Sequence, residues 1–220
     1  MRLRLFMNNK KFQPWQVFVL TSAVLFGLNL PQISLAQEPA PDSVKITGFT
    51  YGGNGCPGGS VGSLVSNDRT TIELLFDKFI VELPSKKYPP NSQCSVSFKL
   101  EYPKGWSASL HKVQHRGFAD TTGSATGQIR AKYYIPGSGG VDAEKVYTVA
   151  PNTNADYKLE TDLLSTAFTP CGEMGVPMTV STRILLRDGQ GDKYNILTVD
   201  SLSQKVKTIL NLKWKSCPNK

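Results

Sequence analysis

Cys94-Ser95-Val96-Ser97-Phe98-Lys99-Leu100-Glu101-Tyr102 alternates apolar and polar side chains without a break. Side chains two residues apart share one face of a β-strand, so this stretch predicts a strand with one buried and one solvated face. The same period of two recurs at residues 176–187 and 206–215. These three stretches indicate that β-structure dominates the fold.

Shorter strand candidates lie around these three stretches, separated by clusters of Gly and Pro. They cover residues 44–51, 70–76, 79–83, 106–114, 127–135, 144–149, 155–161 and 193–199. Helical character is limited to single turns at 162–168 and 201–207, and parallel sheets would need longer crossover helices. The sequence therefore predicts an all-β, antiparallel β-sandwich, with jelly-roll and immunoglobulin-like arrangements both open.

The N-terminus has the layout of a secretory signal peptide. Four basic residues and no acid precede an apolar run at 17–30, and Ser34-Leu35-Ala36 then places small residues before Gln37. We predict a signal peptide at 1–36 with cleavage after Ala36, a flexible lead-in at 37–43 and one domain at 44–218. The alternative is an uncleaved anchor, but the run is short against the roughly 20 apolar residues of a membrane span.

The charge of the mature chain is modest. Four of the 25 basic residues belong to the signal peptide, which leaves 21 against 17 acidic residues and a net charge of +4. Such a charge permits weak attraction to acidic polymers, whereas a nucleic-acid-binding protein needs a concentrated basic face. We therefore expect neither a nucleic-acid partner nor, after signal cleavage, a membrane. The sequence leaves the oligomeric state open.

The four cysteines, Cys56, Cys94, Cys171 and Cys217, all lie in the predicted mature chain. An even number of cysteines in an exported protein predicts two disulfides. Three pairings are open, and we favour Cys56–Cys94 with Cys171–Cys217 because sequential pairing closes shorter loops. No two cysteines are close enough in sequence for a zinc motif, so we predict no metal and no cofactor.

Three sequence features invite a catalytic or metal-binding interpretation. Residues 58–62 match Gly-x-Ser-x-Gly around Ser60, but the strand and helix of a nucleophile elbow are missing, so we interpret them as a loop. His111 and His115 would lie about 13 Å apart along a strand, which is too far to share one metal ion. The loop 188–192 departs from the calcium-loop pattern and is interpreted as a hairpin turn.

Three aromatic residues are candidates for contact with a ligand: Trp106, Tyr133 and Tyr134. Tyr133 and Tyr134 are adjacent, so in a strand one points inward and the other outward. An exposed row of aromatic rings on a sandwich face can bind sugar rings or a protein partner. The alternative interpretation is packing in the core and at its rim.

Several short motifs are specific as a set. They are GNGCPGGS at 53–60, LFDKF at 75–79, the Cys strand and its Tyr-Pro-x-Gly-Trp turn at 94–106, HRGFA at 115–119, PCG at 170–172 and WKSC at 214–217. Together they resemble the exported family called domain of unknown function 4360, found in bacteria and fungi. The resemblance spans residues 45–217 and implies export and cysteine bridges, with no assigned activity. Within these motifs we hypothesise a buried ion pair between Asp77 and Arg116.

These observations predict a secreted or periplasmic protein without enzymatic activity. We expect a binding or structural module at the cell surface or in the extracellular matrix, with polysaccharide or another cell-envelope component as partner. Two alternatives remain. One is a secreted hydrolase whose catalytic carboxylates meet only in space, and the other is a secreted effector or inhibitor.

Overall fold

A computed structural model describes residues 39–134, 143–163, 168–171, 176–189, 193–199 and 207–218. These residues form β-strands, turns and loops, and no helix occurs among them. The strands are β1 (Lys45–Gly52), β2 (Val61–Val65), β3 (Thr71–Phe76), β4 (Ile80–Leu83), β5 (Asn91–Glu101), β6 (Trp106–Asp120), β7 (Thr126–Tyr134), β8 (Ala143–Val149), β9 (Asn154–Asp162), β10 (Val176–Arg187), β11 (Asn195–Thr198) and β12 (Thr208–Ser216).

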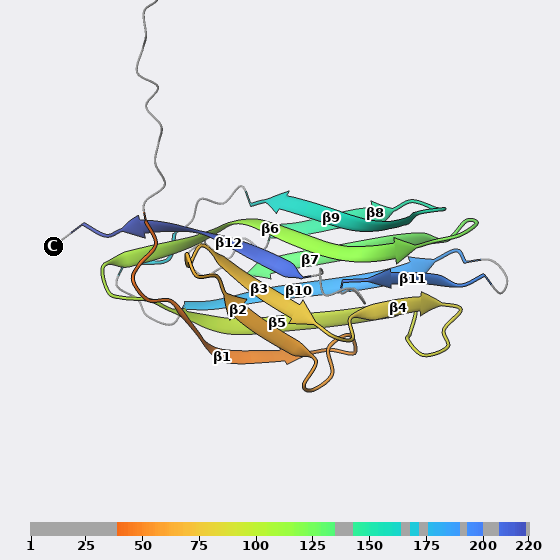
Figure 1. The fold of residues 1–220 in the computed structure, drawn as a ribbon, viewed down its shortest axis with the longest axis horizontal. Coiled ribbons are helices and arrows are strands. Elements are labelled where there is room, and N and C mark those ends of the chain that lie inside the picture. Colours follow the sequence, from red (N-terminus) through yellow and green to blue (C-terminus); the bar gives the residue numbers. More distant parts are fainter. Residues whose placement is uncertain are drawn as a thin grey trace, which may run out of the picture. The chain divides into compact units, whose positions relative to one another are not determined.

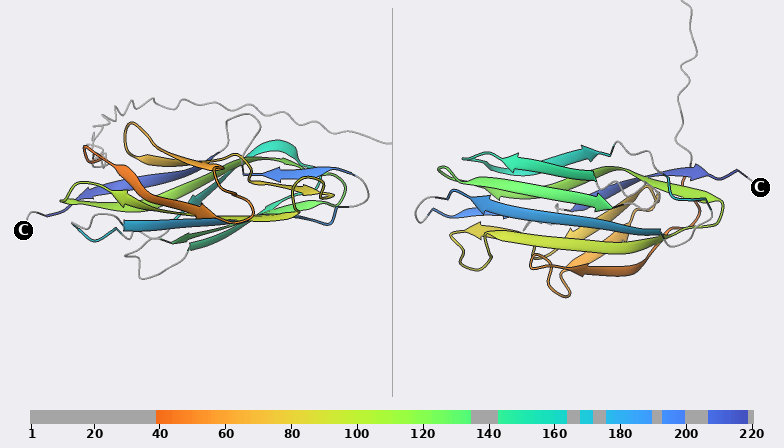
Figure 2. Two further views of the ribbon diagram at one scale, coloured as in Figure 1. Left: turned by 90° about the horizontal axis from the view of Figure 1, so that it is seen from below. Right: turned by 180° about the vertical axis from the view of Figure 1, so that it is seen from behind.

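The strands make two sheets that lie face to face (Figure 1). Sheet A has the order β1-β5-β10-β7-β8, and the view from behind in Figure 2 presents its outer face. Sheet B has the order β2-β3-β12-β6-β11-β4, and β9 also pairs with β6. Every described strand pair is antiparallel. The predicted all-β antiparallel sandwich is therefore confirmed.

The core fills the space between the sheets because each long strand sends alternate apolar side chains inward. In β5 the burial pattern alternates along the whole strand, with Val96, Phe98 and Leu100 almost completely buried. From sheet B, Leu210, Leu212 and Trp214 of β12 meet them in one continuous hydrophobic cluster. The side chains that alternate with these face solvent, where they can contact a ligand.

Each strand predicted from the sequence has a counterpart in the structure, and the largest difference is in β6, which was predicted to end at 114 and continues to Asp120. One strand of the structure, β2, was not predicted. Its sequence, VGSLV, is short and shows little alternation of apolar and polar residues. It exists because β3 offers an open edge with which all five of its residues pair. The two predicted helical turns at 162–168 and 201–207 lie largely outside the described residues.

Two disulfides join Cys56 to Cys94 and Cys171 to Cys217, as favoured from the sequence. Their Cα atoms lie 5.4 Å and 5.8 Å apart, within the usual range for a disulfide. The first bond ties the loop after β1 to the inner face of β5. The second ties the segment after β9 to the end of β12.

The N-terminal end of the described chain is packed rather than loose. The predicted signal peptide lies outside the described residues. Of the lead-in predicted as flexible at 37–43, Pro41 is buried and Ala40 packs against the core. No helix in the described part of the chain is long and apolar enough to cross a membrane.

Candidate functional site

The outer face of sheet A carries two rows of paired hydroxyl groups at its centre. Ser95 of β5 lies directly opposite Ser181 of β10, and their Oγ atoms are 2.8 Å apart. One step along, Ser97 lies opposite Thr179, with 2.9 Å between Oγ and Oγ1. These side chains face outward because their neighbours in each strand fill the core. We call this set, with the outward residues of β7 beside it, the hydroxyl face.

Strand β7 adds an aromatic ring and two cations to the hydroxyl face. Tyr134 lies opposite Thr179, and 44% of its surface is exposed. Lys132 lies opposite Ser181, and Arg130 lies opposite Arg183. The result is a sheet surface that offers hydroxyl donors and acceptors next to one exposed ring and several positive charges.

The other two predicted ligand-facing aromatics do not join Tyr134. Tyr133 is 1% exposed and points into the core. The expectation that adjacent tyrosines face opposite ways is confirmed, but Tyr133 is a core residue and the prediction of a ligand-facing role for it is wrong. Trp106 begins β6 in sheet B and packs against the core, so it shares no face with Tyr134.

Tyr133 takes part instead in a buried polar network that links the two sheets. Its hydroxyl lies 2.7 Å from Nε2 of His115, whose Nδ1 lies 2.9 Å from Oγ1 of Thr208. His115 has no exposed surface, and burial lowers its pKa to about 4. A neutral imidazole has one donor and one acceptor nitrogen, so both hydroxyls find a partner. We assign His115 a structural role.

His111 does not share a site with His115. His111 itself lies at a β-bulge, because the pairing of β6 with β12 passes from Lys112 opposite Asn211 to Leu110 opposite Leu212. His111 is half-buried, and its Nδ1 has no hydrogen-bond partner among the described residues. Burial lowers its pKa, and the charge of Lys213 adds to the effect. No group of residues in the described part of the chain has the composition of a metal site.

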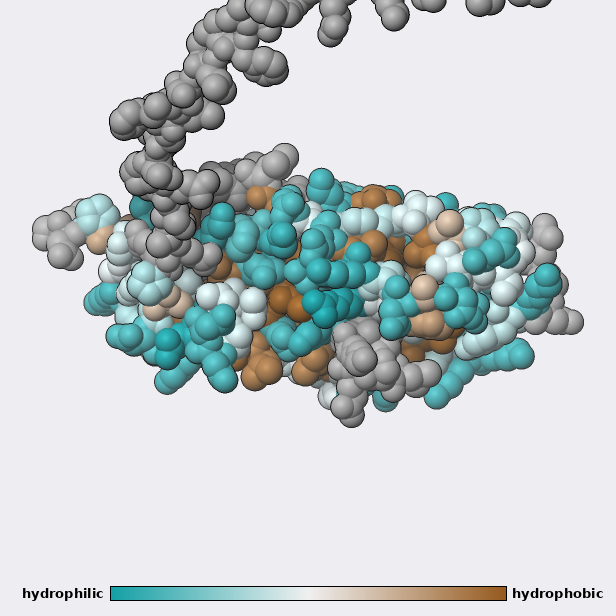
Figure 3. All heavy atoms as spheres, turned by 45° about the horizontal axis from the view of Figure 1, so that its top comes forward, coloured by the Kyte–Doolittle hydropathy of each residue, from teal (hydrophilic) through white to brown (hydrophobic). Residues whose placement is uncertain are grey.

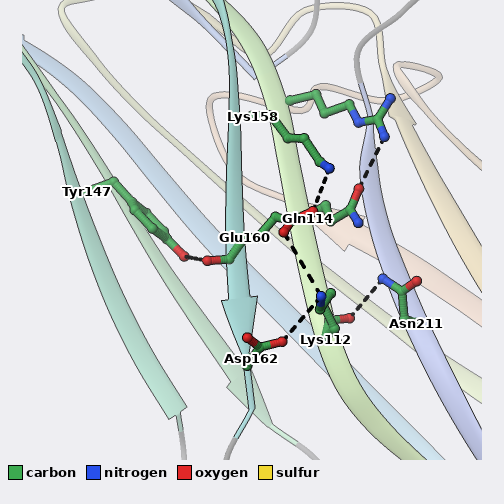
Figure 4. Close-up of polar contacts among 8 residues, drawn as sticks. Lys112, Gln114, Tyr147, Lys158, Glu160, Asp162 and Asn211 are labelled. Carbon is green, nitrogen blue, oxygen red and sulfur yellow. Dashed lines mark hydrogen bonds and ion pairs between the residues drawn. The ribbon is translucent and has the colours of Figure 1, made fainter. Parts of the chain in front are cut away.

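Charged side chains of β6 and β9 form a ladder on the outer face of sheet B (Figure 4). Lys112 lies 3.5 Å from Asp162 and 4.0 Å from Glu160, and Lys158 lies 2.6 Å from Glu160. The hydrogen bond from Lys158 holds the pKa of Glu160 below its usual value. A general acid of a glycosidase needs the opposite shift, so Glu160 is not suited to that role.

The structure does not pair Asp77 with Arg116. Asp77 is exposed in the turn after β3, and its backbone N–H donates to the carbonyl of Ser60. Arg116 lies on β6, where its Nη2 donates to Oε1 of Gln114 at 3.2 Å. No ion pair joins the two charges in the described residues, because the alternation of β6 directs Arg116 to the outer face of sheet B.

The Gly-x-Ser-x-Gly sequence, interpreted as a loop, forms a turn at 58–59 and then enters β2 at Val61, with no helix after Ser60. Ser60 is 2% exposed, and its hydroxyl donates to the carbonyl of Pro57 at 2.6 Å. A buried hydroxyl held by a backbone carbonyl is not poised for nucleophilic attack. The predicted hairpin loop at 188–192 lies partly outside the described residues, which end there at 189.

A buried carboxylate organises the loop after β4. Glu82 is 3% exposed, and its Oε1 accepts hydrogen bonds from the backbone N–H groups of Lys86, Lys87 and Tyr88. Its Oε2 accepts one from the hydroxyl of Tyr194 at 2.9 Å. Burial disfavours the charged form, but these donors outweigh it and hold the pKa of Glu82 below its usual value.

We expect Glu82→Ala to loosen this loop. The change leaves three backbone N–H groups without their acceptor, which should lower the free energy of unfolding by about 2 kcal/mol. Trypsin should then cut after Lys86 and Lys87 faster than in the unchanged protein. Glu101→Ala is the control, because that carboxylate is exposed and accepts one bond from Thr47. Equal cleavage rates in all three proteins would contradict the role of Glu82.

Sequence reasoning missed the hydroxyl face as a unit. Its serines and threonine are visible as the polar half of two alternating stretches, but their residue numbers differ by 82 and 86. On the side of the molecule in Figure 3, hydrophilic residues predominate and hydrophobic ones form several small areas. The large apolar side chains exposed in the described residues are Leu64 and Leu75 on the paired strands β2 and β3, and Tyr134, Val146 and Tyr194 elsewhere.

Comparisons with known sequences place the chain in a family. Residues 42–217 match the profile of a family described as "Domain of unknown function (DUF4360)". A protein of Arthroderma benhamiae called "Uncharacterized secreted protein" is 31% identical over 185 residues, which cover 82% of this chain and 75% of the relative.

Three solved structures are distantly similar to this chain. The agarase AgWH50C is 13% identical with a TM-score of 0.29, and the match covers 86% of this chain and 24% of the agarase. A tailspike domain of bacteriophage CBA120 is 8% identical with a TM-score of 0.23, covering 82% of this chain and 20% of that one. A family 11 carbohydrate-binding module from Clostridium thermocellum is 11% identical with a TM-score of 0.20, covering 81% and 90%. This chain thus spans about a quarter of the agarase, and likenesses of this size carry no conclusion about a ligand.

Proposed function

This chain belongs to the family described as Domain of unknown function (DUF4360), and on that premise we propose that it is a secreted, non-enzymatic module. Its partner is polysaccharide of the cell surface or extracellular matrix, and it binds through the hydroxyl face. The paired hydroxyls beside an exposed tyrosine ring are the observation that carries this proposal.

The chemistry of the hydroxyl face suits a sugar polymer. Each serine or threonine hydroxyl can donate one hydrogen bond and accept two, as sugar hydroxyls do. The rows lie on the central strands of an antiparallel sheet, so little conformational entropy is lost when they bind. A tyrosine ring such as that of Tyr134 supplies a rigid, amphipathic contact that can cover the apolar side of a sugar ring.

Export is supported by two independent observations. The chain carries two disulfides, which persist in oxidising compartments outside the cytoplasm. The relative from Arthroderma benhamiae is called a secreted protein. A secreted module with a rigid polar face fits a role in contact with envelope or matrix material.

The hydrolase alternative has less support than binding. A glycosidase needs one carboxyl group with a raised pKa near a second carboxylate. Glu160 and Asp162 lie two residues apart on β9, yet both are near Lys112, and the pKa of Glu160 is lowered. The effector or inhibitor alternative has no observation in its favour among the described residues.

We expect Tyr134→Ala to weaken retention of the protein on insoluble envelope polysaccharide at high salt. Salt screens charge attraction between exposed groups, so binding that persists in about 1 M NaCl reports hydrogen bonds and ring contacts. Loss of the ring should reduce retention about tenfold, a change of about 1.4 kcal/mol in binding free energy. Cosedimentation of the secreted protein across a salt series measures it.

Leu64→Ala is the matched control for Tyr134→Ala. Leu64 is 54% exposed on β2 in sheet B, so its loss removes exposed apolar surface far from the hydroxyl face. Retention should be unchanged in this variant. If the unchanged protein is not retained at any salt concentration, the polysaccharide proposal fails.

A further inference from the structure

Two arginines face each other directly on the hydroxyl face. Arg183 of β10 lies opposite Arg130 of β7, and both side chains are exposed. The Cβ atoms of directly opposite residues lie about 5 Å apart, and like charges in that position repel. The residues that flank this pair across the sheet are Gln93 on β5 and Val146 on β8, so no acid lies directly opposite either arginine.

The single carboxylate nearby, Glu144, cannot neutralise the positive charges of Arg130, Arg183 and Lys132. Glu144 of β8 accepts from Nη1 of Arg130 at 2.9 Å and lies 3.4 Å from Nζ of Lys132. Arg183 has a neutral partner, because its Nε donates to Oδ1 of Asn91 at 2.8 Å. Three cations therefore share one carboxylate, which leaves an excess of two positive charges.

Each of the two arginines is held by one partner on the neighbouring strands. Asn91 fixes Arg183 through Nε, and no described residue accepts from its Nη atoms. Glu144 engages one Nη atom of Arg130 and leaves other N–H groups of that guanidinium available. A planar guanidinium can bind a carboxylate through two parallel hydrogen bonds, and an arginine held before binding loses less entropy.

The charges on β6 and β9 of sheet B are arranged differently. There Lys112 lies near two carboxylates, Glu160 and Asp162, and Lys158 lies near Glu160. Arg116 of β6 lies opposite Lys158, so three cations meet two carboxylates on this face and the ladder carries an excess of one positive charge. The cluster of Arg130, Lys132 and Arg183 has only one carboxylate, Glu144, and so carries the larger excess of the two.

We infer that Arg130 and Arg183, with Lys132 beside them, bind the carboxylate groups of an acidic polysaccharide, a polyuronate. This inference rests on the proposed function and narrows its partner to a polymer that carries both hydroxyl and carboxylate groups. The sugar hydroxyls meet the rows of Ser95, Ser97, Thr179 and Ser181, while the carboxylate enters between the two guanidinium groups and relieves their repulsion.

The test is titration of the secreted protein with alginate fragments in about 50 mM NaCl, with dextran and dextran sulfate in parallel. The double variant Arg130→Gln/Arg183→Gln should bind alginate about tenfold more weakly, since two bidentate contacts are lost. Its melting temperature should change little, because relief of the repulsion offsets the loss of the exposed contacts of Arg130 with Glu144 and of Arg183 with Asn91. A fall in melting temperature together with weaker binding would instead indicate a structural role and overturn the inference.

The matched control is Lys213→Gln/Lys215→Gln, which removes the same charge from exposed residues of β12 in sheet B. Its affinity for alginate should stay within about twofold of the unchanged protein, because distant exposed charges are screened. If both double variants lose the same affinity for alginate, the binding is general charge attraction and the assignment of the site to Arg130 and Arg183 is wrong. Absence of alginate binding, or arginine-dependent binding of dextran sulfate alone, would overturn the carboxylate assignment.

Failure of this inference is distinguishable from failure of the proposed function. Salt-resistant retention on insoluble polysaccharide that depends on Tyr134, without any effect of the arginine variants, supports the binding face and overturns the carboxylate site. Arginine-dependent binding of alginate without salt-resistant retention supports the carboxylate site and overturns the proposed role of Tyr134.

Discussion

Gly117→Ala is expected to lower the free energy of unfolding by about 4 kcal/mol or more, at the upper end of single-substitution effects. Gly117 lies in β6, and a Cβ atom there would fall far inside van der Waals contact with the backbone carbonyl oxygen of Thr198 and the ring of Tyr157. This carbonyl belongs to the backbone at the end of β11. It therefore cannot move aside by a change of rotamer, as the tip of a flexible side chain can. A shift of β6 or β11 would be needed.

The side chain of Tyr157 occupies the space over Gly117 because it reaches across β6 to hydrogen-bond with β11. Tyr157 of β9 pairs with Gly117, and its hydroxyl donates a hydrogen bond to the carbonyl of Thr198. The tyrosine side chain therefore crosses over β6 to reach β11, which only a residue without a side chain allows. Loss of this arrangement would disturb three strands of sheet B at once.

Denaturant unfolding of the secreted protein measures the effect, and Gly52→Ala is the matched control. Gly52 ends β1, and a Cβ atom there meets nothing within 4 Å. The control should change the free energy of unfolding by less than about 1 kcal/mol. If Gly117→Ala proves as stable as Gly52→Ala, the packing described for Tyr157 is incorrect.

The protein should lose about 3 kcal/mol of its free energy of unfolding between pH 7 and pH 4 through His115 alone. Burial lowers the pKa of this histidine to about 4 in the folded state, against about 6.5 in an unfolded chain. The unfolded chain therefore binds the proton at a higher pH than the folded protein. The contribution of neutral His115 is complete above pH 6.5 and is lost as the pH falls toward 4.

Denaturant unfolding at several pH values measures this loss. In His115→Gln the part of the loss that falls between pH 6.5 and 4 should largely disappear, because an amide does not titrate. His111→Gln is the control. Burial also lowers the pKa of His111, but His111 is only half-buried and should contribute less. An identical pH dependence in the unchanged protein and in His115→Gln would contradict a buried neutral imidazole.

Tyr133→Phe keeps the pH prediction testable if His115→Gln does not fold. This change removes the hydroxyl that lies against Nε2 of His115 but keeps the ring that packs between the sheets. Stability at pH 7 should fall by about 1–3 kcal/mol, since a buried polar atom is left without its partner. The pH dependence should remain, because burial rather than the hydroxyl lowers the pKa of His115.

Some family motifs gain a physical meaning only from the structure. The resemblance marked residues 115–119, and the sequence suggested for them an Asp77–Arg116 ion pair. The structure assigns the burial and hydrogen bonds to His115 and the close approach to Gly117, while Arg116 faces outward. Similarly, Gly55 in the opening motif lies against the ring of Phe79, where a Cβ atom would collide.

The sequence alone indicated the all-β character, which side chains of a strand share a face, and the presence of two disulfides. Period-two alternation identifies which side chains share a face, so Phe98 had to be buried and Lys99 exposed once residues 91–101 formed a strand. Sequential pairing of the cysteines was also correct. These properties depend on neighbours within a strand or on the order of a few residues along the chain.

Only the tertiary structure decided which strands are neighbours and in what register. It placed Tyr133 inward against His115 of the opposite sheet, left Tyr134 outward, and brought Ser95 and Ser181 within 2.8 Å across 86 positions of sequence. The physical reason is that alternation leaves the partner of each strand undefined. Partner and register follow from how two whole sheets pack against each other, which is a property of the complete core.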